Sequence, residues 1–165
     1  MSKLPDPFRL RVLKALTTAL EEIVPTGHTD SLCGSVFRGR DLFGDDDPVP
    51  MLCILEAIDE KVLLTPPDGH TTYQGPWELL IQGFTDDDRM HPSDQAERLL
   101  ADVKIRLIKE RIRSREDNIL GMGGKVTALE ISQGVVRPPD DLSGKAYFWL
   151  RLTLKIVENL ADPYS

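Results

Sequence analysis

Residues 146–157 read AYFWLRLTLKIV, and their strict alternation is the clearest pattern in the chain. Successive side chains of a β-strand point to opposite faces, so the pattern predicts a strand with one apolar face. That face carries Ala146, Phe148, Leu150, Leu152, Leu154 and Ile156. The other face carries Tyr147, Trp149, Arg151, Thr153 and Lys155. At about 3.4 Å per residue the strand spans ~40 Å, which is long for a globular domain.

The segment before this strand predicts its antiparallel partner. Residues 125–136 read as one arm of a hairpin, and residues 137–145 form the connecting loop, which is rich in proline and aspartate. The two arms are longer than the strands that a small sheet requires. We therefore expect part of this C-terminal hairpin to extend onto a neighbouring molecule.

Two helices and three further strands precede the hairpin. Apolar residues at helical spacing predict helices at residues 7–24 and 93–113, with Asp6 and Ser93 as N-caps and Pro7 in the first turn. Strands are predicted at residues 32–37, 51–55 and 77–84, separated by loops at 38–50 and 65–76. This order predicts the α+β class, with a single mixed β-sheet of about five strands flanked by two helices. We expect residues 1–165 to form one domain.

Composition narrows the class of function. The chain has 165 residues and a net charge of −7, from 20 Lys and Arg against 27 Asp and Glu, which argues against a general nucleic-acid binder. No apolar run approaches the ~20 residues of a membrane-spanning helix, and the first residues lack the apolar core of a secretion signal. Two cysteines indicate a reducing compartment rather than a disulfide framework.

The sequence contains no clear motif of a catalytic or cofactor-binding site. Residues 121–125 read GMGGK, but Ile119 and Val126 replace the glycine and the hydroxyl residue of a phosphate-binding loop, so we interpret the segment as a connection. His28, His70 and His91 lack the spacing of zinc ligands. Cys33 and Cys53 both fall in predicted strands, where cysteine acts as a small apolar residue. We predict a protein that is not an enzyme and has no resident cofactor.

Two acidic runs are candidate metal ligands. They comprise Asp45, Asp46 and Asp47, and Asp86, Asp87 and Asp88. Their simplest interpretation is solvated loop acids. The alternatives are a Mg²⁺ or Ca²⁺ ion shared across a subunit interface, or a metal-dependent phosphoesterase if both runs converge in one pocket.

Basic residues gather at the end of the second predicted helix. They are Lys104, Arg106, Lys109, Arg111, Arg113 and Arg115. Cations favour a helix C-terminus, and their long stems cover apolar surface. The alternatives are contact with a phosphate backbone, with an acidic partner, or with the acidic loops of a neighbouring copy.

The hairpin supplies further interface candidates. Aromatic residues and arginine are enriched at interface hot spots, and the mixed face of the last strand carries Tyr147, Trp149 and Arg151. Packing of the two aromatic rings under a helix is the alternative. Arg137, Asp140 and Asp141 in the connecting loop complete the set of candidates.

Several stretches resemble the tail terminator proteins of long-tailed bacteriophages. They are PVPMLCILEAI (48–58), WELLIQGFTDDD (77–88), PSDQAERLLADVKIRLI (92–108) and the closing hairpin KVTALEISQGVVRPPDDLSGKAYFWLRLTLKIVENLADPY (125–164). With the first helix, the resemblance covers residues 7–163. It rests on the order of elements and the texture of the sequence, and no catalytic residue carries over from it.

The resemblance implies a structural role. Members of this family form a six-fold ring that caps the tail tube, ends its polymerisation and offers an attachment surface to the head–neck complex. The implied partners are other copies of the chain, the tail tube protein and a neck or connector protein, with no membrane and no sequence-specific nucleic acid, although the genome passes through the ring. The implied location is the head-proximal end of the virion tail, after assembly in the host cytoplasm, and Mg²⁺ assists ring assembly in some relatives. The alternatives are another neck or head-completion protein, the phosphoesterase, and a monomeric adaptor domain.

Overall fold

Two long antiparallel strands form the centre of the sheet. The structure, a computed structural model, describes residues 4–57 and 64–165. Strands β3 (Thr72–Thr85) and β6 (Ala146–Asn159) have 14 residues each and pair over their whole length. The long strand predicted from the alternation is therefore present, but β3 matches its length within the chain. The length of the last strand is therefore no longer a reason to expect that the hairpin extends onto a neighbouring molecule.

The shorter strands complete a mixed sheet. Strand β2 (Met51–Glu56) pairs antiparallel with β3, and β1 (Val36–Arg38) pairs parallel with β2. On the other side, β4 (Val126–Ile131) and β5 (Val135–Arg137) pair in succession along β6. The α+β class with a mixed sheet is confirmed. The described residues contain six strands rather than about five, because Gly134, with φ 79°, separates β4 from β5 within the predicted arm.

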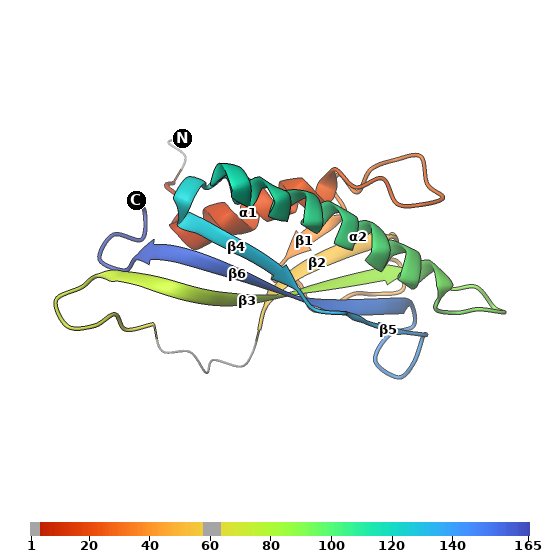
Figure 1. The fold of residues 1–165 in the computed structure, drawn as a ribbon. Coiled ribbons are helices and arrows are strands. Elements are labelled where there is room, and N and C mark those ends of the chain that lie inside the picture. The colour runs from red at the N-terminus through yellow and green to blue at the C-terminus, as the bar shows by residue number, and fades with distance from the viewer. Residues whose placement is uncertain (1–3, 58–63) are drawn as a thin grey trace.

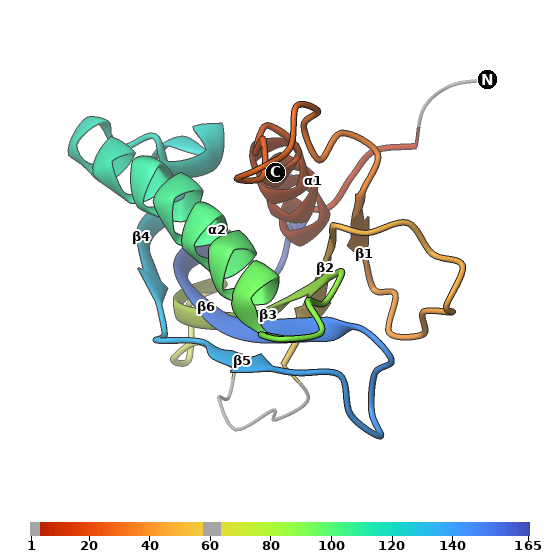
Figure 2. The ribbon, with the colours of Figure 1, turned by 90° about the vertical axis from the view of Figure 1, so that its right-hand side faces the viewer.

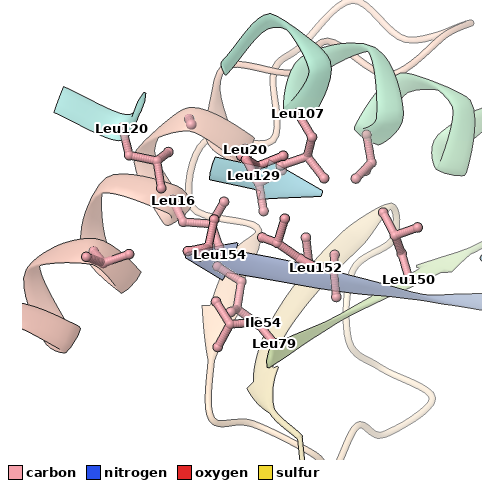
Figure 3. Close-up of a cluster of buried hydrophobic side chains, with 14 of the residues drawn as sticks. Leu16, Leu20, Ile54, Leu79, Leu107, Leu120, Leu129, Leu150, Leu152 and Leu154 are labelled. Atoms are coloured by element: carbon pink, nitrogen blue, oxygen red, sulfur yellow. The ribbon is translucent and has the colours of Figure 1, made fainter. Parts of the chain in front are cut away.

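Both helices lie on the same face of the sheet. Figures 1 and 2 show α1 (Phe8–Glu21) and α2 (Asp94–Ile112) side by side above the strands. Three short 3₁₀ turns, Arg113–Glu116, Ile119–Gly121 and Gly123–Lys125, connect α2 to β4. The main core lies between the layers (Figure 3). Its fully buried members include Leu16, Leu20, Leu79, Leu107, Leu150, Leu152 and Leu154.

The predicted helix caps are wrong in detail. The side chains of Pro7 and Ser93, the N-cap residues of the two helices, make no capping hydrogen bond. Asp6 instead pairs with Lys14, 2.6 Å between Oδ2 and Nζ. The first helical N–H, that of Phe8, donates to the carbonyl of Pro163 at 2.7 Å. The C-terminal segment therefore supplies the acceptor expected from a local cap.

Two strand boundaries differ from their predictions. Gly34, with φ 79°, turns the chain within residues 32–35, so β1 begins only at Val36. Strand β3 begins at Thr72, inside the predicted 65–76 loop. It includes Pro76 because pairing with β2 starts only at Leu79, and proline is tolerated on such an unpaired strand edge.

Candidate functional site

The basic residues of α2 and of the turn after it fall into two groups. One group binds a buried carboxylate, and the other is exposed on the surface. The carboxylate of Glu110 is buried and accepts hydrogen bonds from Arg106, Arg113 and the N–H of Leu120 at 2.9–3.1 Å. Burial raises the pKa of Glu110, but these hydrogen bonds outweigh it and leave the pKa below its ordinary value. Arg106 and Arg113 thus connect the end of α2 to the following turn, although the side chain of Arg113 remains 40% exposed.

The outward side of α2 carries an apolar stripe. Ile105, Ile108 and Ile112 are 57%, 39% and 58% exposed, and their spacing of three and four residues places them on one helix face. We call these three residues the isoleucine stripe. Exposed or half-exposed cations lie beside it and beyond its end, and they are Lys104, Lys109, Arg111 and Arg115. An apolar row bordered by cations is typical of a surface that binds another macromolecule.

A second apolar cluster lies on the opposite face of the sheet. Met51, Phe84 and Tyr147 are buried there, with Phe37, Phe43 and Trp149 packed against them. Ile81 of β3 and Leu150 of β6 are paired and belong to the core beneath the helices. Trp149 is the neighbour of Leu150 in the strand, so its side chain points to the opposite face, as does that of Tyr147. Tyr147 and Trp149 therefore do not lie under a helix, and the alternative packing considered for them is wrong.

Two loops cover this cluster and contact each other. Loop 39–50 follows β1, and loop 138–145 joins β5 to β6 (Figure 2). Lys145 extends from the second loop and donates from Nζ to the carbonyls of Gly44 and Asp45 at 3.2 and 3.0 Å. Within the first loop, Arg40 pairs with Asp47 at 2.7 Å and stacks on the ring of Phe43. The loops are therefore held in defined positions.

Asp140 organises the second loop. Its carboxylate accepts hydrogen bonds from the N–H groups of Leu142 and Ser143 and from the hydroxyl of Tyr147, which lies 2.9 Å away. The Leu142 N–H is the main reason that the pKa of Asp140 lies below its ordinary value. Burial, followed by the hydrogen bond to Asp140, raises the pKa of Tyr147. Asp140, a predicted interface residue, therefore shapes the turn that presents Leu142.

A cleft lies between the two loops. It has a volume of about 390 Å³, and its floor includes Phe84, Tyr147 and Trp149. Leu42 and Leu142, which also line it, are 81% and 86% exposed. We call this feature, with its two exposed leucines, the loop cleft. The two leucines and the aromatic floor give the loop cleft an apolar part, beside the polar side chains of Asp41, Asp45, Gln82 and Lys145, which also line it.

The two acidic runs line different hollows. Asp45 lines the loop cleft, whereas Asp86 lines a second hollow of about 360 Å³ near the start of α2, together with His28 and Arg98. In the second hollow, Asp102 accepts two 2.8 Å hydrogen bonds from Thr26. Across residues 4–57 and 64–165, no group of three or more His, Cys, Asp or Glu side chains is placed to hold a metal ion. The convergence that the phosphoesterase hypothesis requires is not seen there.

The remaining predicted interface residues lie on β5, on β6 and in loop 138–145. Arg137 lies 3.9 Å from Asp140, and Arg151 lies 3.6 Å from Glu78 on the face away from the helices. Asp141 is exposed at the tip of loop 138–145. Of the nine candidates, five lie at or beside the loop cleft, and they are Arg137, Asp140, Asp141, Tyr147 and Trp149.

Sequence reasoning misplaced one of the cysteines and missed the three isoleucines of the stripe and the two exposed leucines of the loop cleft. Cys33 is exposed in a turn rather than in a strand, whereas Cys53 is buried in β2 as predicted. The periodicity of the isoleucine stripe could have revealed it, since residues 105, 108 and 112 share one helix face. Nothing local in the sequence brings Leu42 and Leu142 together.

Comparison with family models and with curated sequences gives no match. Among the described helices, none has both the length and the apolar character needed to cross a membrane. The functional argument therefore depends on the geometry above and on the resemblance seen in the sequence.

Proposed function

We propose that this chain is a structural virion protein that forms a ring at the head-proximal end of a phage tail. The ring caps the tail tube, ends its polymerisation and provides the surface to which the head–neck complex attaches. The observation that carries the proposal is the isoleucine stripe. The described part of a single copy leaves this apolar row open to water, and assembly would bury it.

The charge distribution supports self-assembly. The chain is acidic overall, with a net charge of −7, yet the surface beside the isoleucine stripe is basic. Unlike patches on one molecule favour head-to-tail contacts, and such contacts generate a ring when the rotation between copies closes. The six-fold number and the neighbours, tail tube protein on one side and connector on the other, come from the resemblance to tail terminators.

A role for Mg²⁺ in this assembly remains part of the proposal. Asp45 and Asp46 are exposed at a loop tip, as are Asp87 and Asp88. Carboxylate oxygens are suitable ligands for Mg²⁺, which usually keeps several waters and takes one or two carboxylates. An ion bound between an acidic run of one copy and a carboxylate of the next would stabilise a ring.

The test is a tube-polymerisation assay with purified tail tube protein. Added chain is expected to shorten the tubes and to appear in electron micrographs as a six-fold ring at one end. The Ile105→Asp variant, changed at an exposed position, is expected to lose capping while keeping the folded circular-dichroism spectrum. Tubes whose lengths do not respond to the chain would contradict the proposal. Binding to a connector without any effect on tubes would indicate a different neck protein.

A further inference from the structure

The two apolar surfaces complement each other. We propose that the isoleucine stripe of one copy docks into the loop cleft of a second copy, so that neighbouring subunits join head to tail. This inference rests on the proposed ring function and names the contact that would build the ring.

Shape and apolar character agree on both sides. The isoleucine stripe is a convex row on a helix, whereas the loop cleft is hollowed, about 390 Å³ in volume, and bordered by Leu42 and Leu142. Helices with apolar residues at positions i, i+3 and i+7 are commonly received in such grooves. The aromatic floor and the two leucines provide apolar partners for the three isoleucines.

Charge complementarity identifies the occupant as a second copy. The cations near the isoleucine stripe are Lys104, Lys109, Arg111 and Arg115. The exposed acids of the two loops are Asp41, Asp45, Asp46, Asp140 and Asp141. The nearby Arg40 and Lys145 are engaged within the loops by Asp47 and by two backbone carbonyls, so they offset this acidic surface little. Opposite potentials on facing patches favour the correct partner and its orientation.

The placement of the two surfaces excludes a contact within one copy. In Figure 2 the C-terminal half of α2 lies at the upper left, whereas loops 39–50 and 138–145 lie at the right. Figure 1 likewise places the end of α2 and loop 138–145 at opposite ends of the molecule. Two complementary surfaces on opposite sides of one molecule produce a heterologous interface between copies. Such an interface leads to a closed ring or to a filament.

The loop cleft is also preorganised. Hydrogen bonds of Lys145 to the first loop, and of Tyr147 to Asp140, fix the two loops before any partner arrives. Ordering of loops on binding is a main cost of association, and the loop cleft avoids much of it.

Mixed disulfide formation tests the contact. In a Cys33→Ser background, which removes the exposed thiol, one sample carries Ile105→Cys and a second carries Leu142→Cys. Under mild oxidation at high concentration, the mixture is expected to give a 105–142 disulfide dimer faster than either sample alone. Met90→Cys, 78% exposed and outside both surfaces, is the control partner. A dimer that forms equally with the control, or faster within the Ile105→Cys sample alone, overturns the head-to-tail docking.

Charge reversal provides a second readout by native mass spectrometry. Lys109→Glu with Arg111→Glu, or Asp45→Lys with Asp141→Lys, is expected to remove species larger than the monomer. A mixture of the two variants is expected to recover oligomers in which the variants alternate, because each stripe then faces a cleft of opposite charge, and 1 M salt is expected to weaken them. Oligomers that persist in both variants overturn the docking but leave the ring function standing. Failure of the unchanged chain to cap tail tubes contradicts the ring function itself.

Discussion

The two sides of helix α2 both carry apolar residues, but one side is buried and the other is exposed. The inward side places Leu99, Val103 and Leu107 at helical spacing against the sheet, each at most 2% exposed. The outward side also has helical spacing, with Ile105, Ile108 and Ile112, which stay in contact with water. The spacing of apolar residues therefore indicates that a helix face packs against another surface. It does not show whether that surface belongs to the same chain or to another one.

The two faces of the sheet differ in a related way. The helix-covered face is closed by leucine packing, whereas the other face is closed by two loops that depend on hydrogen bonds and on the stacking of Arg40 over Phe37 and Phe43. We infer that the first face holds the fold and that the second presents a binding surface. The following predictions test this division, beginning with the largest expected effect.

Adjacent residues on α2 give the sharpest test. Leu107→Ala removes a fully buried side chain and is expected to lower the free energy of unfolding by about 3–4 kcal/mol. Ile108→Ala, one residue along, is expected to change it by no more than about 0.5 kcal/mol. Urea denaturation measures both. Equal losses for the two variants would contradict the division between inward and outward sides.

Removal of the buried carboxylate of Glu110 is expected to be almost as costly. Glu110→Ala leaves the buried N–H of Leu120 without its acceptor and leaves the largely buried Arg106 with only its ion pair to Glu22, which is expected to cost about 3 kcal/mol. Glu116→Ala, at an exposed position in the next turn, is the matched control and is expected to be nearly neutral. Thermal unfolding of both variants compares them, and a neutral Glu110→Ala would show that the network does not hold this end of α2.

The close approach of Gly83 to Phe148 predicts a smaller effect. A Cβ atom at residue 83 would lie 2.1 Å from the ring of Phe148, inside the main core, so Gly83→Ala is expected to cost about 2 kcal/mol. Gly124→Ala, where a Cβ meets nothing within 4 Å, is the control. Urea midpoints that shift equally for both variants would contradict tight packing between β3 and β6.

The pH dependence of stability gives the smallest effect. Because the folded state lowers the pKa of Glu110 from its ordinary value of 4.5, its contribution is complete above that value. The contribution is lost as the pH falls through the lower folded pKa. The stability difference between the unchanged chain and Glu110→Gln should therefore shrink as the pH falls below 4.5. A difference that grows in acid would contradict the lowered pKa.

The sequence allowed the α+β class and most elements to be predicted, because β6 and both helices carry strong periodicity. Its errors occur where geometry overrides local pattern. Gly34 and Gly134 adopt positive φ and break predicted strands, and Pro76 lies within β3 because its neighbouring edge is unpaired. The Phe8 N–H finds its acceptor at Pro163, a partner that no local rule identifies.

The candidate surfaces were predictable only in part. The basic end of α2 and the aromatic residues of β6 stood out because their charge and alternation are local features. The loop cleft did not, since it joins residues about 100 positions apart through the contact of Lys145 with Gly44 and Asp45. Separation of the internal Arg106 from the exposed Arg111 also required the position of Glu110.

The mass of the assembled species tests the central claim, that the outward side of α2 serves to build a ring. Native mass spectrometry at tens of micromolar, with and without Mg²⁺ and then with short tail tubes, provides that mass. The account predicts a closed species of six copies of the 18.5-kDa chain, lost in Ile105→Asp. A chain that stays monomeric in all three samples would contradict it.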